Sequence, residues 1–356
     1  MGCKYQQIAE TLKARIAEGV YPPDSMLPTE FQLCEQYGVS RQTIRMALKT
    51  LADQNIIQRR QGSGSRVLNL SDAPAERRKT VAIITTYISD YIFPAILREA
   101  EAVLSANNCS TLLFATSNQL FNERRILLNL LQETHIDGIL VEGTKSALPN
   151  PNLDLYQKLR ERKIPLVFFN GSYDNLDAVS VLDDNFDGGR QLTRYLAGKG
   201  HRIIAGIFKS DDIQGHQRFA GFSSAMCEEN LPLEDRHVFW YRTEDKPELT
   251  PDSKLWDHAL APVLEGCSAV VCYNDEVASY VIQCLTRRGV SVPGQMAVVS
   301  FDNSLYSRLT VPRITSLSHG DLNAGRVAAE TLLALFRGEA PESRLLPWTL
   351  EEKESS

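Results

Sequence analysis

Residues 38–51 read GVSRQTIRMALKTL, and this stretch decides the fold at the beginning of the chain. Ser40 is a good N-cap, and apolar residues recur at helical spacing after it, so one face of the predicted helix is buried. The other face keeps four long polar side chains in water: Arg41, Gln42, Arg45 and Lys49. On an isolated helix such a face is usually only a solvated surface, so the neighbouring segments decide its role.

The segments before this helix complete a three-helix pattern. Apolar residues at helical spacing in 5–16 predict a first helix. Thr29, with Gln32 three residues later, forms a capping box that predicts a second helix up to Tyr37. Two helices joined by the glycine turn at Gly38 are a helix-turn-helix, whose second helix presents its first turns to the DNA major groove. There Arg and Gln can bond base edges, while Ser or Thr can bond phosphate.

The segment after the helix predicts a hairpin. Residues 56–60 and 65–68 have the composition of two short strands, and residues 61–64 (QGSG) form the turn between them. Such a hairpin is a wing, and its glycine tip can approach the minor groove closely. Its arginines would then lie near phosphates: Arg59, Arg60 and Arg66.

Charge is divided unevenly along the chain. The net charge of the 356 residues is -6, which argues against a general nucleic-acid coat. Residues 1–70, however, hold 9 Lys/Arg against 6 Asp/Glu, whereas residues 81–356 hold 26 against 36. A small basic module thus precedes an acidic body, and the length allows two or three domains.

Cysteine usage and hydropathy predict the compartment. The seven cysteines form no C-x-x-C pair, and the sequence holds no signal peptide and no apolar run of membrane length. We therefore expect a soluble cytoplasmic protein with reduced thiols. We also expect no cofactor and no metal, because three scattered histidines are more typical of hydrogen-bonding or capping residues than of metal ligands: His201, His216 and His319.

From residue 80 onward, apolar runs alternate with helical stripes. In the first half we predict strands at 81–86, 112–115, 138–141, 165–169 and 178–182, with helices at 94–104, 122–132 and 153–162. In the second half we predict strands at 202–208, 237–241, 269–273 and 296–300, with helices near 188–197, 216–228, 254–264 and 276–288. A strand at 314–318 and a helix at 322–337 close the fold. Repeated β-α units predict parallel sheets covered on both faces, and two such halves predict a cleft between them.

The predicted strands of this region end in polar loops. These loops lie at 87–93, 142–145, 170–173, 183–184, 210–212, 274–275 and 302–303. Each loop alone is usually a cap or a turn. Their shared position at the carboxyl ends of strands favours a binding site, and carboxylates and amides beside aromatic rings suit a polyhydroxylated ligand.

The composition of residues 70–79 separates the two regions. This segment, LSDAPAERRK, holds one aliphatic residue, a proline and mixed charge, which is typical of a linker. The predicted domains are therefore a winged helix-turn-helix DNA-binding domain at 1–69, the linker at 70–79, and a two-lobed α/β domain at 80–356 for effector binding and dimerisation. We expect a dimer because one winged module makes too few contacts for genomic specificity.

The N-terminal region resembles the winged helix-turn-helix of the GntR family of bacterial transcription regulators. The match runs through LPTE at 27–30, YGVSRQTIR at 37–45 and GSG at 62–64. This resemblance implies that Arg41 and Arg45 contact DNA in the major groove and that the wing tip also touches it. The residues that we assign to DNA contact are Thr29, Glu30, Ser40, Arg41, Gln42, Thr43, Arg45, Lys49, Gln61, Gly62 and Gly64.

Two positions depart from the GntR pattern. Asn55 stands where a glycine usually ends the reading helix, and this change is mild because Asn tolerates the left-handed conformation. Ser65 and Arg66 replace the usual Thr-Phe of the wing, which leaves the packing of the wing open.

Residues 80–350 resemble the effector domain of LacI/GalR regulators, which is similar to the periplasmic-binding-protein fold of sugar-binding proteins. The matching residues are DGG at 187–189, GKGHR at 198–202, HQRFAGF at 216–222, YND at 273–275 and VSFD at 299–302. The resemblance implies that Asn170, Arg218, Asp275 and Asp302 line the sugar cleft. The full set that we assign to the ligand is Tyr91, Phe93, Glu142, Lys145, Asn170, Asp183, Arg218, Asn274, Asp275 and Asp302.

A GntR-type head on a LacI-type body resembles the arabinose repressors of Gram-positive bacteria, and residues 86–94, 142–147 and 209–215 support this narrower match. The resemblance implies a repressor that binds operator DNA as a dimer and is released by a small sugar, with L-arabinose as the leading candidate. Spacing and composition alone indicate at most a sugar. A regulator of the same architecture that responds to a different sugar or sugar derivative therefore stays open.

No motif indicates an enzyme. The strand predicted at 81–86 leads into YISD at 87–90, with no G-x-G-x-x-G to bind a dinucleotide, and the sequence has neither a Walker loop nor H-E-x-x-H. A transport binding protein would need a signal peptide and would not need a winged head. We therefore expect a regulator that is not an enzyme.

Overall fold

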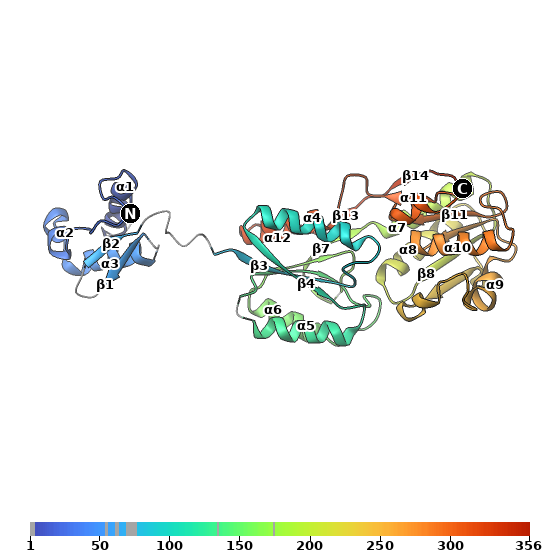
Figure 1. Cartoon of the computed structure of the whole chain (residues 1–356), viewed down its shortest axis with the longest axis horizontal. Coiled ribbons are helices and arrows are strands. Elements are labelled where there is room, and N and C mark those ends of the chain that lie inside the picture. Colours follow the sequence, from blue (N-terminus) through green and yellow to red (C-terminus); the bar gives the residue numbers. More distant parts are fainter. Residues whose placement is uncertain (1–3, 54–55, 61–63, 69–76, 134, 174) are drawn as a thin grey trace. The chain divides into compact units, whose positions relative to one another are not determined.

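The structure is a computed structural model, and it describes residues 4–53, 56–60, 64–68, 77–133, 135–173 and 175–356. These residues divide into two compact units, Met1–Arg78 and Lys79–Ser356. We describe each unit by itself (Figure 1).

The first unit is a winged helix-turn-helix. Its elements are α1 (Lys4–Ala17), α2 (Glu30–Tyr37), α3 (Arg41–Asp53), β1 (Ile57–Arg60) and β2 (Gly64–Val67). The helices pack around one apolar core in which Leu12, Leu33 and Leu48 are buried. The two strands pair antiparallel, with Ile57 opposite Val67. The predicted helix-turn-helix and its hairpin are therefore confirmed.

Local hydrogen bonds explain where α2 and α3 begin and end. The Gln32 backbone N–H donates to Thr29 Oγ1 at 3.3 Å, and the Thr29 N–H donates back to Gln32 Oε1 at 2.9 Å, which is the predicted capping box. Gly38 ends α2 at φ +60°, a left-handed conformation that glycine adopts without strain. The N–H of Thr43 then donates to Ser40 Oγ at 3.3 Å, so Ser40 caps α3 as predicted.

The structure shows what the two residues that depart from the usual wing sequence contact. Ser65 is on the buried side of β2. Arg66 lies on the exposed side and forms an ion pair with Asp24 at 2.7 Å, so it fastens the wing to the turn before α2. Asn55 lies outside the described residues.

The second unit contains two sheets, one in each lobe. The first lobe has the strand order β13-β7-β6-β5-β3-β4, and its described pairs are parallel. Its strands are β3 (Lys79–Thr85), β4 (Cys109–Ala115), β5 (Gly138–Glu142), β6 (Leu166–Phe169), β7 (Val179–Asp183) and β13 (Arg344–Leu346). Helices α4 (Phe93–Ala106) and α12 (Ala324–Phe336) cover one face, and α5 (Leu120–Gln132) and α6 (Leu153–Glu161) cover the other (Figure 1). Both faces are covered, as a parallel sheet requires.

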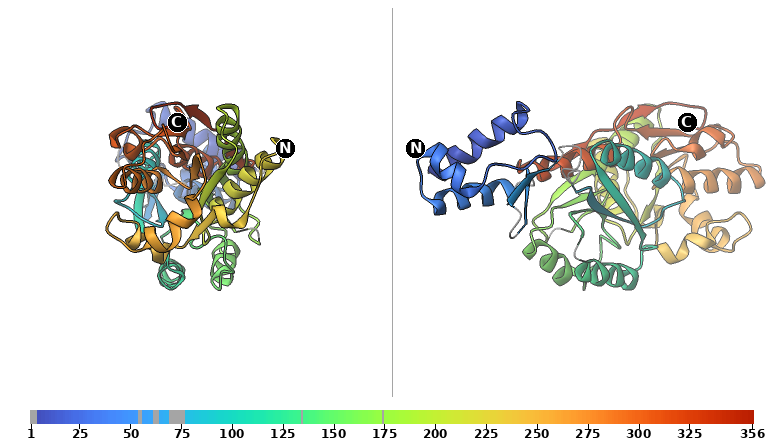
Figure 2. Two further views of the ribbon diagram at one scale, coloured as in Figure 1. Left: turned by 90° about the vertical axis from the view of Figure 1, so that its right-hand side faces the viewer. Right: turned by 60° about the vertical axis from the view of Figure 1, so that its left-hand side comes forward.

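The second lobe repeats this plan with one antiparallel edge strand. Its strand order is β14-β12-β11-β10-β8-β9, and β14 is antiparallel to β12. Its strands are β8 (Ile204–Lys209), β9 (Val238–Tyr241), β10 (Ala269–Cys272), β11 (Ala297–Phe301), β12 (Thr315–Ser318) and β14 (Thr349–Glu351). Helices α7 (Asn185–Gly198) and α8 (Ile213–Glu228) cover one face, and α9 (Ala261–Leu264) and α10 (Asp275–Arg287) cover the other. Figure 2 shows the layers of both lobes from two further directions.

The chain crosses between the lobes three times within residues 175–356. The crossings lie between β7 and α7, between β12 and α12, and between β13 and β14. The carboxyl ends of the strands of both sheets therefore meet on either side of one cleft.

Three details differ from the sequence-based expectation. The predicted helix 322–337 is α12, but it packs on the first sheet because the chain has crossed back after β12. The predicted helix 254–264 is divided into a π-helical turn η3 (Trp256–Leu260) and α9, because Pro262 cannot donate a backbone hydrogen bond. The short helix α11 (Leu305–Leu309) and the strands β13 and β14 were not predicted.

Candidate functional site

The exposed face of α3 carries the predicted DNA-reading residues. Ile44 and Leu48 are buried in the core of the first unit, whereas Arg41 and Arg45 keep 71% and 59% of their side chains exposed. Gln42 and Lys49 are exposed on the same helix. The amphipathic division predicted from the sequence is therefore confirmed, and the guanidinium groups lie at the surface, where a DNA groove can meet them.

Glu30 forms ion pairs with three arginines, two on α3 and one on the wing. Its carboxylate accepts from Arg41 Nε at 2.9 Å, from Arg45 Nε at 3.1 Å and from Arg59 Nη2 of the wing at 3.0 Å. Partial burial opposes ionisation, but the hydrogen bonds from Arg41 and Arg45 outweigh it and hold the pKa of Glu30 below its usual range. Because Arg41 and Arg45 donate to Glu30 through Nε, the terminal nitrogens of both guanidinium groups can still bond base edges. Glu30 thus aligns the arginines.

The hydroxyl residues assigned to DNA have structural partners. The Thr29 hydroxyl belongs to the cap of α2, and Ser40 Oγ lies 2.9 Å from Thr43 Oγ1 at the start of α3.

Gly64 begins β2 at φ +89°, next to the wing tip, where a non-glycine residue would be strained. Gln61 and Gly62 lie outside the described residues.

A cavity lies between the lobes of the second unit, at the carboxyl ends of both sets of strands. Of the ten residues assigned to the ligand, eight line it: Tyr91, Phe93, Glu142, Asn170, Asp183, Arg218, Asn274 and Asp302. The structure therefore brings most of the predicted set together. Lys145 and Asp275 lie outside the lining.

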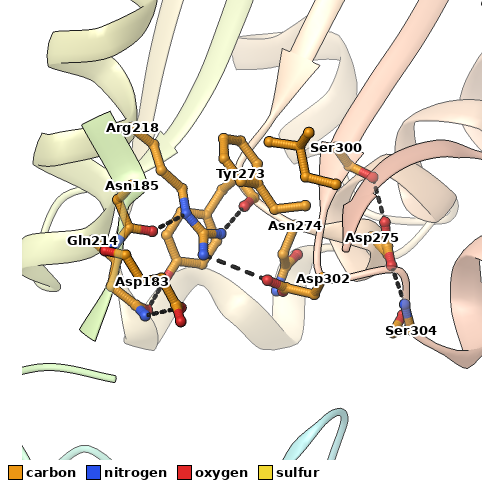
Figure 3. A network of polar contacts seen from close by, with 12 residues as sticks. Asp183, Asn185, Gln214, Arg218, Tyr273, Asn274, Asp275, Ser300, Asp302 and Ser304 are labelled. Atoms are coloured by element: carbon orange, nitrogen blue, oxygen red, sulfur yellow. Dashed lines mark hydrogen bonds and ion pairs between the residues drawn. The ribbon is translucent and has the colours of Figure 1, made fainter. Parts of the chain in front are cut away.

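Arg218 lines this cavity from the second lobe. Figure 3 shows its polar contacts. Its Nε donates to Asn185 Oδ1 at 2.8 Å, its Nη1 donates to the Tyr273 carbonyl, and its Nη2 lies 3.4 Å from Asp302 Oδ1. The guanidinium also lies over the Phe301 ring, 4.2 Å from its centroid. Arg218 is fully buried, so it fixes Asp302 at the edge of the cavity.

Asp275 lies behind the cavity rather than in it. Its carboxylate accepts from the hydroxyls of Ser300 and Ser316 and from the Ser304 N–H at 2.6 Å, so α10 points it into the lobe (Figure 3). Burial, and then the charge of Asp302, raises the pKa of Asp275 to about 6. Asp275 therefore supports the loop that carries Asp302.

Tyr91 connects the lobes at one side of the cavity. Its hydroxyl donates to Asp302 Oδ2 at 2.6 Å and accepts from the Asp275 N–H at 3.2 Å. Tyr91 has φ +56° and Asp302 has φ +94°, which are strained values for residues other than glycine. Strain of this kind is typical of functional sites.

Glu142 ends β5 on the first lobe and faces the same cavity. Its Oε2 accepts from the Thr86 N–H and Thr86 hydroxyl, both at 2.7 Å, and from the Thr85 hydroxyl at 3.0 Å. Burial raises the pKa of Glu142 to about 7, although these hydrogen bonds act in the opposite direction.

Lys145 bridges the lobes beside the cavity. Its Nζ binds Glu244 and lies 3.7 Å from Asp211 Oδ2, and both carboxylates belong to the second lobe. Asn118 of the first lobe donates to Thr243 Oγ1 at 2.6 Å in the same interface. Lys145 therefore contributes to the contact between lobes rather than to the lining of the cavity.

Comparisons with known proteins identify the families of both units. Residues 4–67 match the gntR family of bacterial regulatory proteins, and residues 193–356 match a periplasmic binding protein-like domain. The arabinose metabolism transcriptional repressor of Halalkalibacterium halodurans is 34% identical over 347 residues, which cover 95% of this chain and 91% of the relative. The repressor of the same description from Geobacillus stearothermophilus is 36% identical over 333 residues, covering 94% and 91%. The chain belongs to the family of arabinose metabolism transcriptional repressors.

Solved structures support the same architecture for this repressor. The transcription regulator CcpA of Lactococcus lactis has a TM-score of 0.68 and 25% identity, and the match covers 79% of this chain and all of that one. The regulator CelR, solved as a cellobiose complex, has a TM-score of 0.67 at 23% identity and covers 93% of this chain and all of that one. The two relatives of 34% and 36% identity are transcriptional repressors, so this chain is a regulatory protein rather than an enzyme.

Several residues that line the cavity of the repressor were not predicted. They are Thr86, Tyr87, Ile92, Lys209, Asp212, Gln214, Tyr241, Lys246, Tyr273 and Glu276. Most of them directly follow a strand or lie in a loop already identified as polar, so the signal was their position. Lys246 belongs to a short 3₁₀ helix, η2 (Thr243–Glu248), that is too short for a helical periodicity to reveal it.

Two further structural findings concern metals and membranes. Among the described residues, no group of His, Cys, Asp and Glu is arranged to hold a metal ion. None of the helices described is long and apolar enough to cross a membrane.

Proposed function

We propose that residues 1–69 bind operator DNA, that residues 80–356 bind a small sugar and form a dimer, and that residues 70–79 link the two parts. Sugar binding releases the repressor from its operator. A protein that acts on chromosomal operators works in the cytoplasm. The observation that carries this proposal is the cavity between two lobes in a chain whose other unit presents an arginine-bearing helix.

The charge pattern of the cavity supports an uncharged polyhydroxylated ligand. Carboxylates such as Glu142 and Asp183 can each accept from two hydroxyls. The cations of the described lining are already paired: Lys209 with Asp212, Arg218 with Asp302, and Lys246 with Glu276. A phosphate would need a cation without a carboxylate partner, so this lining favours a free sugar over a sugar phosphate.

Aromatic side chains of the first lobe support binding of a sugar face. Tyr87 and Phe93 both line the cavity and pack edge to face, with ring centroids 5.9 Å apart. Aromatic rings beside a few fixed polar groups are typical of pockets for small polar ligands. The names of the two relatives with 34% and 36% identity point to arabinose among free sugars.

A panel of sugars tests the ligand. We expect L-arabinose to raise the melting temperature of the full-length repressor in a concentration-dependent way, because a ligand that binds the folded state alone stabilises it by mass action. D-xylose, D-galactose, D-glucose and L-arabinose 5-phosphate serve as comparisons. Stabilisation by another sugar but not by L-arabinose would assign the alternative, a regulator of this architecture with a different effector.

An exposed apolar surface supports the dimer. Leu305, Leu309 and Val311, on and after α11, are 64%, 70% and 83% exposed, and with Tyr306 they border a groove of about 670 Å³. Surfaces of this kind are typical of protein interfaces. On the first lobe, the edge strand β4 also exposes Leu112. We assign this α11 surface to a second copy of the chain, and light scattering after size-exclusion chromatography checks for twice the chain mass.

A further inference from the structure

The three crossings between the lobes meet at one side chain, His319. This histidine follows β12 and lies in the second crossing. Its Nε2 lies 3.0 Å from Asp183 Oδ1, which ends β7 in the first crossing. Its Nδ1 lies 3.0 Å from the Pro347 carbonyl, and its ring stacks on Trp348 with centroids 3.7 Å apart, both in the third crossing. One imidazole therefore contacts all three connections.

The hydrogen-bond partners of His319 define its protonation state. A neutral imidazole has one N–H donor and one bare nitrogen that accepts. Both partners of His319 are oxygen acceptors, because one is a backbone carbonyl and the other is the carboxylate of Asp183. With Asp183 ionised, both ring nitrogens donate, and only the imidazolium form has two N–H groups.

The surroundings of His319 favour this positive charge. Burial alone would lower the pKa of His319, but the hydrogen bond and charge of Asp183, the Pro347 carbonyl and the charge of Asp302 outweigh burial and raise it. The Trp348 ring is buried against Phe301 and presents its face to the imidazolium. The Arg218 guanidinium is a cation near this tryptophan, 5.7 Å from its ring centroid.

We propose that His319 is a positioning residue of the sugar response: its doubly protonated ring ties the three crossings together and holds Asp183 at the cavity. Asp183 lines the cavity and also accepts from Gln214 Nε2 at 3.3 Å, so its position affects the ligand site directly. The part that concerns sugar rests on the proposed function, whereas the charge of His319 does not.

The positive charge of His319 makes the tie between the crossings depend on pH. Because the pKa of His319 is raised in the folded protein, the tie is complete below the ordinary histidine value of 6.5 and is lost as the pH rises through the raised value. Loss of one N–H leaves either Asp183 or the Pro347 carbonyl without its donor. Sugar affinity is then expected to fall at high pH, since closing the lobes no longer starts from an ordered hinge.

Nitrogen NMR of full-length repressor with ¹⁵N-labelled histidine tests the charge without any sugar. At pH 6.5, the ordinary histidine value, we expect two protonated ring nitrogens to predominate at His319, assigned by the disappearance of their signals in His319→Phe. His201 is the internal comparison, because burial and Lys199 lower its pKa, and it should be neutral at that pH. If His319→Phe does not fold, Asp183→Asn provides the assignment, because removing the carboxylate beside Nε2 should shift the His319 ring signals. A neutral His319 ring, including one beside a protonated Asp183, would overturn the proposal.

Sugar titration of His319→Phe tests the positioning role. The variant keeps a ring to stack on Trp348 but removes both donors, so we expect roughly 10-fold weaker L-arabinose binding, as for loss of one charge-assisted hydrogen bond. Operator binding without sugar should stay within about twofold. His201→Phe is the matched control. Wild-type sugar affinity in His319→Phe would contradict the proposal, whereas a wild-type protein that binds no arabinose would contradict the proposed function and leave the NMR result to decide His319.

Discussion

Glu30 illustrates how one residue can act on DNA binding without reading a base. Its carboxylate holds Arg41, Arg45 and Arg59, which come from the reading helix and from the wing. A carboxylate at a DNA surface is unfavourable by itself because it repels phosphate. Its value lies in the order that it gives to three flexible side chains.

Arg45→Ala should weaken binding to the cognate operator by about 1–3 kcal/mol, because a base-reading guanidinium is lost. Thermal stability should stay nearly unchanged, since the Arg45 side chain is 59% exposed. Fluorescence anisotropy with a labelled operator measures the affinity. Lys49→Ala is the comparison, and it should weaken all sequences alike and reduce the salt dependence by about one unit. Unchanged operator affinity in Arg45→Ala would remove this residue from the reading set.

Glu142 makes stability depend on pH. Burial raises its pKa from 4.5 to about 7, so the unfolded chain releases this proton at lower pH than the folded protein does. The group therefore costs stability as the pH rises from 4.5 to 7, and the full cost applies above 7. Glu142→Gln keeps an acceptor for Thr85 and Thr86 but does not ionise. At pH 8 it should be more stable than the wild type by up to roughly 3 kcal/mol, and at pH 4.5 the difference should vanish. Denaturant unfolding across this pH range measures it, and parallel pH profiles of the two proteins would contradict the account.

At the scale of elements, regular patterns were predictable and short ones were not. The residues of α3 repeat at helical spacing and carry their own cap, so its position followed from sequence. By contrast, β4 begins at Cys109, and its first residues, Cys109 to Thr111, hide the strand because two of them are polar. Helix α11 has five residues, too few for any periodicity, and most of its apolar side chains face outward.

The candidate site shows the same limit. The order of strands and loops predicted which segments meet at the cleft, because the carboxyl ends of parallel strands share one edge. It did not predict side-chain direction. Asn274 and Asp275 are consecutive residues, yet Asn274 lines the cavity while α10 turns Asp275 into serine hydroxyls behind it.

Helix α11 offers a test of the dimer surface. Leu309→Glu places a carboxylate on the apolar α11 surface, so the dimer should be weaker and dissociate at a higher protein concentration. Operator affinity should also fall, because each head then binds its half-site separately. Folding stability should change little, since Leu309 is 70% exposed in the single chain. Leu345→Glu is the matched control, because Leu345 is 62% exposed on β13, at the far edge of the first sheet from β4. Analytical ultracentrifugation measures the dimer dissociation constant of both variants. An unchanged dissociation constant in Leu309→Glu would mean that the dimer interface lies on another surface.

At the scale of the whole molecule, the two units should be separable. Their apolar cores share no residue, and the composition of residues 70–79 is that of a linker. Limited proteolysis should therefore release a fragment that begins near residue 80 and still binds sugar. Mass spectrometry and calorimetry check the cut and the affinity. A fragment of this length that has lost sugar binding would mean that the cleft depends on the head.

The switch requires that sugar prefer one arrangement of the lobes. A ligand shifts an equilibrium only by the difference in its affinity for the two states. Tyr91 contacts Asp302 and Lys145 contacts Glu244 across the lobes, so a ligand in the cavity would act on an interface that protein side chains also form. On the proposed function, a change in that interface is what alters operator binding.

Operator binding by the full-length repressor as L-arabinose is added tests the central claim most directly. The account predicts tight binding to a near-palindromic operator without sugar, and a fall of at least 5-fold in affinity at saturating L-arabinose, the lower range of allosteric coupling. D-xylose at the same concentration is the comparison and should leave the complex intact. Operator affinity that is unchanged by saturating L-arabinose, in a protein shown to bind that sugar, would contradict the account.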